Sequence, residues 1–286
     1  MRPALTIVVN SYNMERELAR TLTSLAPPHQ RDLPLEGVEV IVMDNGSKRP
    51  PSNEEAARPG LEVRVCRFPA PTRSPVAAMN LGLTQARGDI IAAMIDGARM
   101  ASRGLVRSAL AAIQAHPRAV VASYNYHLGP KPQHQSIHEG YDRIVEDALL
   151  ASIDWPDGGD RLFEISSPAV GEGWPGPLVE SNALFMRREM WDEVGLYEPR
   201  FTSAGGGAAN PDLFIRACAL PGAQLVKLVG EATFHQIHGG TIANMNGREA
   251  LRTLLLEYAK IRKKPLAPVT DPGSIYDARH ATIATQ

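Results

Sequence analysis

Three groups of polar residues in the first hundred positions have the side chains that a nucleotide site requires. Ser11, Tyr12 and Asn13 follow one apolar segment, Asp44 follows the next, and Asp96 ends a later one. An aromatic ring can stack on a base, and a carboxylate beside it can accept hydrogen bonds from the base and ribose. A carboxylate can also hold a divalent cation that bridges two phosphate oxygens. Such residues also form turns without any ligand, but their repetition after three segments favours a binding site.

The apolar segments that precede these residues are predicted to be strands buried on both faces. They are too continuous for strands with one face in water, and they occupy residues 5–9, 38–43, 61–66, 90–95 and 119–123. Helical patterns lie between them at residues 14–25, 76–86 and 105–115, and Asn13 is placed to cap the first. This alternation indicates a doubly wound α/β sheet, in which ligands bind beyond the carboxyl ends of the strands. The polar residues are therefore predicted to meet at that edge.

The second half of the chain has a different pattern. Residues 127–177 are rich in proline and glycine and contain one clear amphipathic segment, residues 141–153, which is typical of a substrate-binding insertion. The expected order is completed by strands at 183–186 and 224–229 and helices at 188–194, 212–219 and 247–264. The tail from Pro265 is expected to be loosely held.

Composition argues against several classes of protein. Among 286 residues, 30 are basic and 31 acidic, so the net charge of −1 gives no overall positive field for nucleic acid or an anionic membrane. No apolar run approaches the ~20 residues that cross a bilayer, and no signal-peptide pattern opens the chain, so a cytoplasmic protein is expected. The glycine motifs of dinucleotide-binding and P-loop proteins are missing. Cys66 and Cys218 are expected to be reduced thiols.

Several motifs together resemble the nucleotide-sugar glycosyltransferases of family 2, which have the GT-A fold. The resemblance covers roughly residues 5–240 and lies in segments 6–13, 40–47, 78–83, 94–99, 185–188 and 194–201. It implies an α/β, Rossmann-like doubly wound mixed sheet with a loop-rich acceptor region. It further implies a nucleotide-sugar binding half at 1–126, an acceptor-binding and catalytic half of the same domain at 127–246, and a C-terminal helix and tail at 247–286.

The sequence departs from the family pattern at three positions. Ala98 replaces the second carboxylate of the Asp-x-Asp metal motif, so Asp96 is the only acidic ligand that the motif offers. Met79 replaces an arginine expected at the diphosphate, while Asn80 beside it is kept as a nucleotide-binding candidate. Asn210 stands where the family has its catalytic base, and an amide does not accept a proton at neutral pH. Either the site has been rebuilt or the protein binds a ligand without catalysis.

The resemblance points to His235 and His238 as parts of a rebuilt metal site, because many GT-A enzymes bring a histidine to the metal at this place in the chain. With Asp96 and diphosphate oxygens, either imidazole would hold Mn²⁺ or Mg²⁺, and a nitrogen ligand favours Mn²⁺. Arg99 follows the metal position and is a candidate contact for a phosphate or sugar, or else a solvated arginine. One surface histidine and one core histidine are the alternative interpretation.

Two carboxylates are candidates for the missing catalytic base. Glu180 precedes the strand at 183–186, at the mouth of the predicted acceptor cleft. Asp212 lies two residues beyond the family's base position and could instead brace its helix. Trp155 and Trp174 lie in the loop-rich region, where their indole faces could stack on an acceptor sugar or simply pack.

These residues predict a glycosyltransferase that moves a hexosyl group from a nucleoside diphosphate sugar, of the UDP or GDP type, to a hydroxyl of a saccharide or small glycoside. The resemblance implies inversion at the anomeric carbon. The alternatives are a catalytically silent protein that binds a nucleotide sugar or polysaccharide, and an interaction protein that keeps only the fold. No nucleic-acid partner and no membrane span are expected, and oligomerisation is left open.

Overall fold

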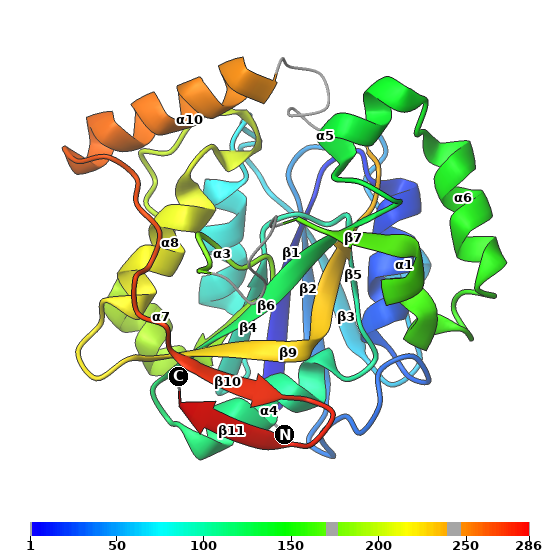
Figure 1. Cartoon of the computed structure of the whole chain (residues 1–286), viewed down its shortest axis with the longest axis horizontal. Helices are drawn as coiled ribbons and strands as arrows, with labels where there is room; N and C mark the ends of the chain where they lie inside the picture. The colour runs from blue at the N-terminus through cyan, green and yellow to red at the C-terminus, as the bar shows by residue number, and fades with distance from the viewer. Residues whose placement is uncertain (1, 170–176, 239–246, 286) are drawn as a thin grey trace.

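A single mixed β-sheet organises the chain (Figure 1). Its strands are β1 (Leu5–Ser11), β2 (Val38–Asp44), β3 (Glu62–Arg67), β4 (Ile90–Met94), β5 (Arg99–Ala101), β6 (Ala119–Leu128), β7 (Ser166–Pro168), β8 (Leu184–Arg187), β9 (Gln224–His235), β10 (Ser274–Asp277) and β11 (Thr282–Thr285). The computed structural model describes residues 2–169, 177–238 and 247–285. The strand order is β11-β10-β9-β6-β8-β4-β1-β2-β3, with β5 paired to β9 and β7 to β6. β1 to β4 are parallel, whereas β8 is antiparallel to β4 and β6, so the sheet is mixed as predicted.

Helices cover both faces of this sheet. They are α1 (Glu15–Leu25), α2 (Asn53–Ala56), α3 (Val76–Gln85), α4 (Leu105–Ala115), α5 (Gln133–Ser136), α6 (Arg143–Ser152), α7 (Arg188–Val194), α8 (Ala209–Cys218) and α10 (Gly247–Arg262), with short 3₁₀ turns at Ile137–Glu139, Gly159–Ile165 and Ala204–Gly206. α1 and α4 share one buried cluster with the sheet, and α3, α7 and α8 share the other, which α10 also joins (Figure 1). None of the described helices combines the length and hydrophobicity needed to cross a bilayer.

Alternate residues of the central strands belong to opposite apolar clusters. Ile7 and Val9 pack with α1, whereas Val8 between them packs with α3. All seven residues of β1 and of β2 are buried. Successive side chains of a strand point to opposite faces, so a strand covered on both sides is apolar throughout. This confirms the predicted two-sided burial for β1 and β2. The prediction is wrong for residues 61–66, because β3 is the last strand of the sheet and none of its residues is buried.

The prediction of a loosely held tail is wrong. β10 pairs in parallel with β9, and β11 pairs antiparallel with β10 (Figure 1). Ser274 and Tyr276 are buried there. Residues 274–277 carry only two large apolar side chains, too few to signal a strand, and it is the free edge of β9 that supplies their backbone hydrogen-bond partners.

The insertion after β6 folds over α1. Arg20 of α1 forms an ion pair with Asp147 of α6 at 2.5 Å, and both Arg16 and Arg20 bind the buried Glu146 of α6. A small apolar cluster that includes Leu150 and residues of β5, β6 and β9 fills the space beneath α6. Within the described residues of the predicted substrate insertion, α6 therefore packs on the side of the sheet that carries α1.

Asp212 ties α8 to α10. Its side chain is 1% exposed, and its carboxylate accepts from Arg216 at 2.8 Å and from Arg262 at 2.5 and 2.7 Å. Arg216 also donates to the carbonyls of Val194 and Leu196, after α7. Of the two roles considered for Asp212, the structure assigns bracing, because both carboxylate oxygens are occupied by guanidinium groups.

Asp212→Asn should lower the free energy of unfolding by about 3 kcal/mol, because two half-buried arginines lose a buried charged partner. Urea denaturation monitored by circular dichroism measures this loss. The control is Asp160→Asn, which removes an exposed ion pair with Arg31 and should change stability by less than about 1 kcal/mol. Similar losses in the two variants would contradict the bracing role.

Candidate active site

The polar residues predicted from the sequence meet at the carboxyl edge of the sheet. Ser11 pairs in register with Asp44, and Met94 pairs with Val9, so the segment that begins at Asp96 emerges beside the end of β1. Gly97 permits a close approach at this point, since a Cβ there would lie 2.4 Å from the carbonyl oxygen of Asn10. A larger residue would push the turn between β4 and β5 away from β1.

The turns after β1 and β2 are bound to each other. Asn13 has a left-handed backbone with φ 53°, and its side-chain oxygen accepts from the Lys48 N–H at 2.9 Å. The prediction that Asn13 caps α1 is therefore wrong. Asn13 instead links the turn after β1 to the turn after β2. Tyr12 is 52% exposed, which leaves its ring accessible to a ligand. The Asp44 carboxylate is fully buried under the Ser47 turn, whose N–H lies 3.3 Å from both of its oxygens.

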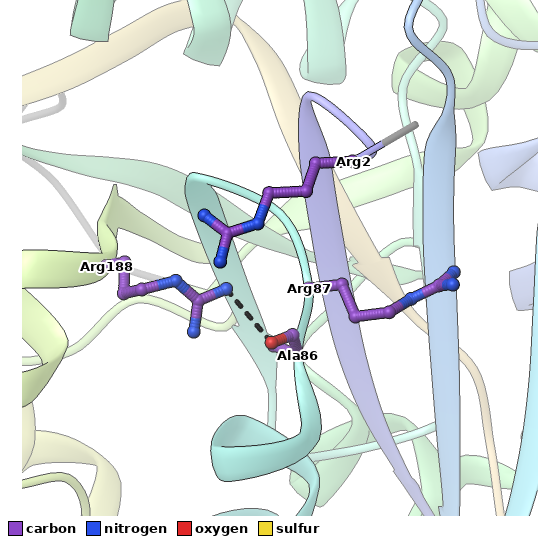
Figure 2. Close-up of a pocket in the computed structure, with 4 residues that line it drawn as sticks. All are labelled: Arg2, Ala86, Arg87 and Arg188. Carbon is purple, nitrogen blue, oxygen red and sulfur yellow. Dashed lines mark hydrogen bonds between the residues drawn. The ribbon is translucent and has the colours of Figure 1, made fainter.

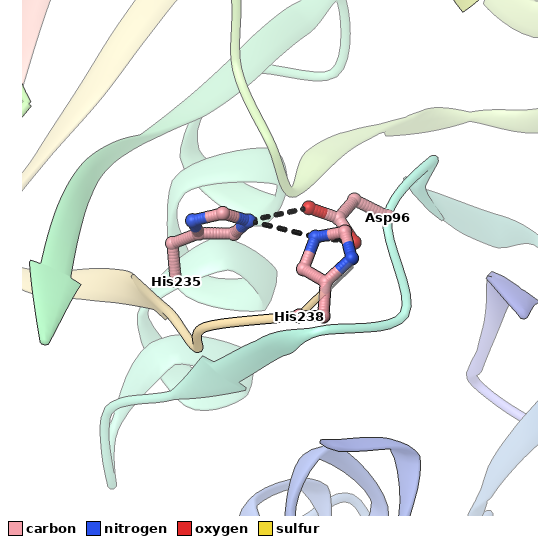
Figure 3. A group of neighbouring side chains, drawn as sticks. All are labelled: Asp96, His235 and His238. Carbon is pink, nitrogen blue, oxygen red and sulfur yellow. Dashed lines mark hydrogen bonds and ion pairs between the residues drawn. The ribbon is translucent and has the colours of Figure 1, made fainter. Parts of the chain in front are cut away.

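Asp96, His235 and His238 form a compact cluster (Figure 3). His235 Nε2 lies 3.2 Å from Asp96 Oδ2 and 3.1 Å from His238 Nε2, and His238 Nε2 lies 3.7 Å from Asp96 Oδ1. The three ligand atoms all lie within 4.8 Å of one another. One carboxylate and two converging imidazole nitrogens are a donor set that fits a divalent transition metal such as Mn²⁺.

Charge and burial shift the pKa values of two members of this cluster, Asp96 and His235. Burial opposes ionisation of Asp96, but His238 and Arg99 hold the pKa of its carboxyl well below its usual range. Burial, with the charge of Arg99, lowers the pKa of His235 to about 4. The ring of His127 packs edge-on against His235 at 5.3 Å, and burial lowers its pKa to about 2. At neutral pH the cluster therefore presents a carboxylate and a neutral His235 imidazole.

Arg99 is not a solvated side chain. It is nearly buried, its Nε donates to Asp96 Oδ2 at 3.0 Å, and its Nη1 donates to the side-chain oxygen of Asn125 on β6. The guanidinium thus shares with the two histidines the only carboxylate of the motif. The sequence contained no signal for Asn125 or His127, because the contact of Asn125 with Arg99 and that of His127 with His235 depend on the pairing of β6 with β9.

Glu180 and Asn210 are joined by a hydrogen bond. Asn210 Nδ2 donates to Glu180 Oε2 at 2.9 Å and to the Ser181 carbonyl at 3.0 Å, and Asn210 Oδ1 accepts from the Tyr197 hydroxyl at 3.3 Å. Burial, together with the charge of Glu180, raises the pKa of Tyr197, so this hydroxyl keeps its proton. Glu180 Oε1 makes no hydrogen bond to the residues that the structure describes.

The strand pairing brings Glu180 to the same edge as Asp96. Leu184 of β8 pairs antiparallel with Ala93 of β4, so residues before β8 emerge where β4 ends. Glu180 lies four positions before Leu184, and Asp96 lies three positions after Ala93. Glu180, one of the two candidate bases, therefore lies before the start of β8, at the edge of the sheet where Asp96 follows the end of β4.

Other predicted site residues have structural contacts. The Asn80 side chain is held by the backbone of Tyr197, donating to its carbonyl at 2.8 Å and accepting from its N–H at 3.0 Å. Trp155 is partly buried against the cluster beneath α6, with its ring 6.5 Å from that of His29. These contacts favour packing over ligand binding at both positions. Trp174 lies outside the described residues.

The cavity of about 510 Å³ in Figure 2 lies at the opposite end of the strands. Its lining consists of four residues: Arg2, Ala86, Arg87 and Arg188. Arg2 precedes β1, Ala86 and Arg87 precede β4, and Arg188 directly follows β8. Its arginines have partners: Arg188 donates to the Ala86 carbonyl at 2.9 Å, Arg87 pairs with Glu39, and Arg2 pairs with Asp89. The cavity is therefore separate from the cluster around Asp96.

Residues 6–163 match the sequence pattern described as Glycosyl transferase family 2. The chain belongs to this family. No curated protein matches it by sequence. The match covers β1 to β6 and the insertion as far as residue 163, and so includes Tyr12, Asp44 and Asp96. Glu180 and both histidines of the cluster lie beyond it.

Several solved structures have a similar fold. Staphylococcus aureus TarS 1–349 in complex with UDP-GlcNAc has a TM-score of 0.56 and 16% identity, over 91% of this chain and 67% of that one. TarS 1–349 alone has a TM-score of 0.53 and 16% identity, over 91% and 66%. The mannosyltransferase PcManGT from Pyrobaculum calidifontis, in complex with GDP-Man and Mn²⁺, has a TM-score of 0.53 and 16% identity, over 94% and 66%. The chain thus spans about two thirds of the length of these neighbours.

At such identities the comparison supports the fold, which is the GT-A arrangement expected from the sequence. The description of the family that the chain matches names the transfer of a glycosyl group. The local substitutions distinguish this member of family 2. Ala98 is fully buried in the core, and only its N–H reaches Asp96, at 3.0 Å.

Arg99→Gln should tighten the binding of Mn²⁺ to the nucleotide-free protein by about tenfold, the equivalent of ~1.4 kcal/mol of relieved charge repulsion. Asp96→Asn should abolish the binding, because it removes the only carboxylate of the cluster. Calorimetric titration with Mn²⁺ measures both effects. Arg103→Gln is the control, since Arg103 binds the carbonyls of Pro156 and Asp157 instead. Weaker Mn²⁺ binding in Arg99→Gln would contradict the idea that the Arg99 guanidinium and Mn²⁺ compete for the Asp96 carboxylate.

Proposed function

We propose that this family 2 protein transfers a hexosyl group from a nucleoside diphosphate sugar to a hydroxyl of a saccharide or small glycoside. The observation that carries the proposal is the convergence of Asp96, His235 and His238 at the carboxyl edge of the sheet, the edge at which the accessible Tyr12 follows β1. The UDP-GlcNAc and GDP-Man complexes of similar folds support a donor of the UDP or GDP type.

The nucleoside would bind at the turns after β1 and β2. Tyr12 offers an exposed ring for stacking on the base. Ser11 and Asp44 pair across β1 and β2. To bind the nucleoside, the Asp44 carboxylate would have to exchange its contact with the Ser47 N–H for one with the ligand. Asn13 holds the two turns together and thereby shapes this part of the site.

The diphosphate would lie against Asp96, His235, His238 and Arg99. A divalent cation, Mn²⁺ or Mg²⁺, held by the cluster would supply a Lewis acid that stabilises the departing diphosphate. Arg99 provides a permanent positive charge next to the same carboxylate, and its guanidinium can bind phosphate oxygens directly. With such a cation bound, the cluster and Arg99 together would neutralise charge on the departing diphosphate, and no proton donor would be required.

Glu180 is the group that we assign as general base. Its Oε2 is held by Asn210, which leaves Oε1 to accept the proton of the acceptor hydroxyl. The hydroxyl oxygen then bonds to the anomeric carbon while the bond from that carbon to the diphosphate breaks. Direct displacement of this kind inverts the anomeric configuration, as the family resemblance implies.

One alternative has specific support. Ala98 and Asn210 replace two carboxylates of the family pattern, which favours a protein that binds a nucleotide sugar and does not turn it over. A screen of UDP- and GDP-sugars with and without Mn²⁺ distinguishes the two functions by measuring binding and donor hydrolysis on the same samples. Turnover of one donor supports the transferase, whereas saturable binding without turnover across many acceptors supports the silent binding protein.

Glu180→Gln should lower the rate of the chemical step by ~10²- to 10⁴-fold, because it removes the basic oxygen and keeps the size of the side chain. Nucleotide affinity should stay nearly unchanged. Single-turnover kinetics and calorimetry measure the two quantities. The control is Glu164→Gln, an exposed carboxylate paired with Arg161. Undiminished turnover in Glu180→Gln would remove this residue from the mechanism.

A further inference from the structure

We infer that Glu146 of α6 is a positioning residue that sets the loop carrying His235 and His238. Its importance for catalysis rests on the proposed function, whereas its hold on the loop is a property of the fold. The side chain of Glu146 is fully buried, and its Oε2 accepts the backbone N–H of Ile237 at 2.6 Å. Ile237 is the residue that directly precedes His238.

Several polar side chains hold the loop after β9. Gln133 of α5 donates to the His235 carbonyl at 2.9 Å. The Gln236 N–H donates to the Ala98 carbonyl at 2.9 Å, and the Gln236 side chain donates to the Glu17 carbonyl of α1 at 2.9 Å. These contacts fix the position of His235 and of Gln236. Among the described residues, the peptide that leads into His238 is bound by Glu146.

The Glu146 carboxylate is in turn bound by two positively charged side chains of α1. Its Oε1 accepts from Arg16 and, at 3.5 Å, from Arg20, both on α1, while the Tyr141 hydroxyl donates to Oε2 at 3.3 Å. Two guanidinium groups fix the carboxylate in one orientation, with Oε2 toward the loop. A hydrogen bond to a charged acceptor is stronger than one to a neutral acceptor, so the Ile237 peptide is held firmly.

This arrangement joins three parts of the proposed site. α1 begins three residues after Tyr12, α6 belongs to the acceptor-side insertion, and the loop carries two members of the candidate metal cluster. Glu146 is the group at which all three meet. The insertion therefore does more than cover the acceptor side, because one of its helices determines where His238 can lie.

Glu39 offers a matched control for a merely structural role. Like Glu146, it is fully buried and bound by two arginines, Arg64 at 2.9 Å and Arg87 at 2.8 Å. It also accepts the backbone N–H of Arg87 at 3.1 Å. Glu39 lies near the start of β2, at the opposite end of the strand from Asp44. A general loss of stability should therefore be similar in Glu39→Ala and Glu146→Ala.

The test compares Glu146→Ala, Glu146→Gln and Glu39→Ala under conditions in which each is folded by circular dichroism. The first readout is the hydrogen-exchange rate of the Ile237 amide by NMR, and the second is the affinity for Mn²⁺ in the presence of UDP. We expect Glu146→Ala to speed the exchange by at least about tenfold and to weaken Mn²⁺ binding by about tenfold. Glu146→Gln keeps an acceptor and should show smaller changes of both kinds. Glu39→Ala should leave both readouts unchanged.

Unchanged exchange at Ile237 in folded Glu146→Ala would overturn the inference, as would equal changes in Glu39→Ala. If Glu146→Ala does not fold, Glu146→Gln decides, and wild-type values in both readouts would reject the positioning role. Asp96→Asn and His235→Ala separate this inference from the proposed function. If neither alters Mn²⁺ affinity, the metal site is rejected, while the exchange at Ile237 still tests whether Glu146 holds the loop.

Discussion

Burial of the central strands on both faces is the constraint on which the rest of the structure depends. Val8 faces one apolar cluster and Ile7 and Val9 face the other, so an unpaired polar side chain in the middle of these strands costs free energy. Polar groups that act on a ligand must then lie beyond the strand ends. The parallel order of β1, β2 and β4 brings three of these ends to one edge, and the site forms there.

The electrostatics of the site depend on one carboxylate. Ala98, the position of the second family carboxylate, is buried in the core, so Asp96 alone carries negative charge in the motif. Arg99 and two histidines surround it, and they supply the positive charge and the nitrogen ligands that a diphosphate site can use. Replacement of a carboxylate by imidazoles changes the preference of the donor set from Mg²⁺ toward Mn²⁺.

Asn210 and Glu180 also form a local pair of an amide and a carboxylate. The amide that stands at the family's base position donates a hydrogen bond to a carboxylate from a different segment. Tyr197 keeps the amide oriented, since its hydroxyl donates to the oxygen and leaves the nitrogen to face Glu180. Asn210, which the sequence resemblance places at the family's base position, is thus hydrogen-bonded to the carboxylate that we propose as the base. In the same way, Ala98 contacts Asp96, whose other neighbours are His235 and His238.

The sequence by itself determined which segments of the first half form the main strands, the doubly wound fold and the edge at which Tyr12, Asp44 and Asp96 gather. These features follow from periodicity and from local turn residues, which act over a few positions of the chain. Only the tertiary structure decided that Asn13 links two turns, that Asp212 braces α10, and that the tail extends the sheet. It also decided the contacts of Glu146 with Ile237 and of Glu180 with Asn210, which join residues 91 and 30 positions apart. Such contacts depend on how helices and loops pack in space, and the local pattern of residue types does not predict that packing.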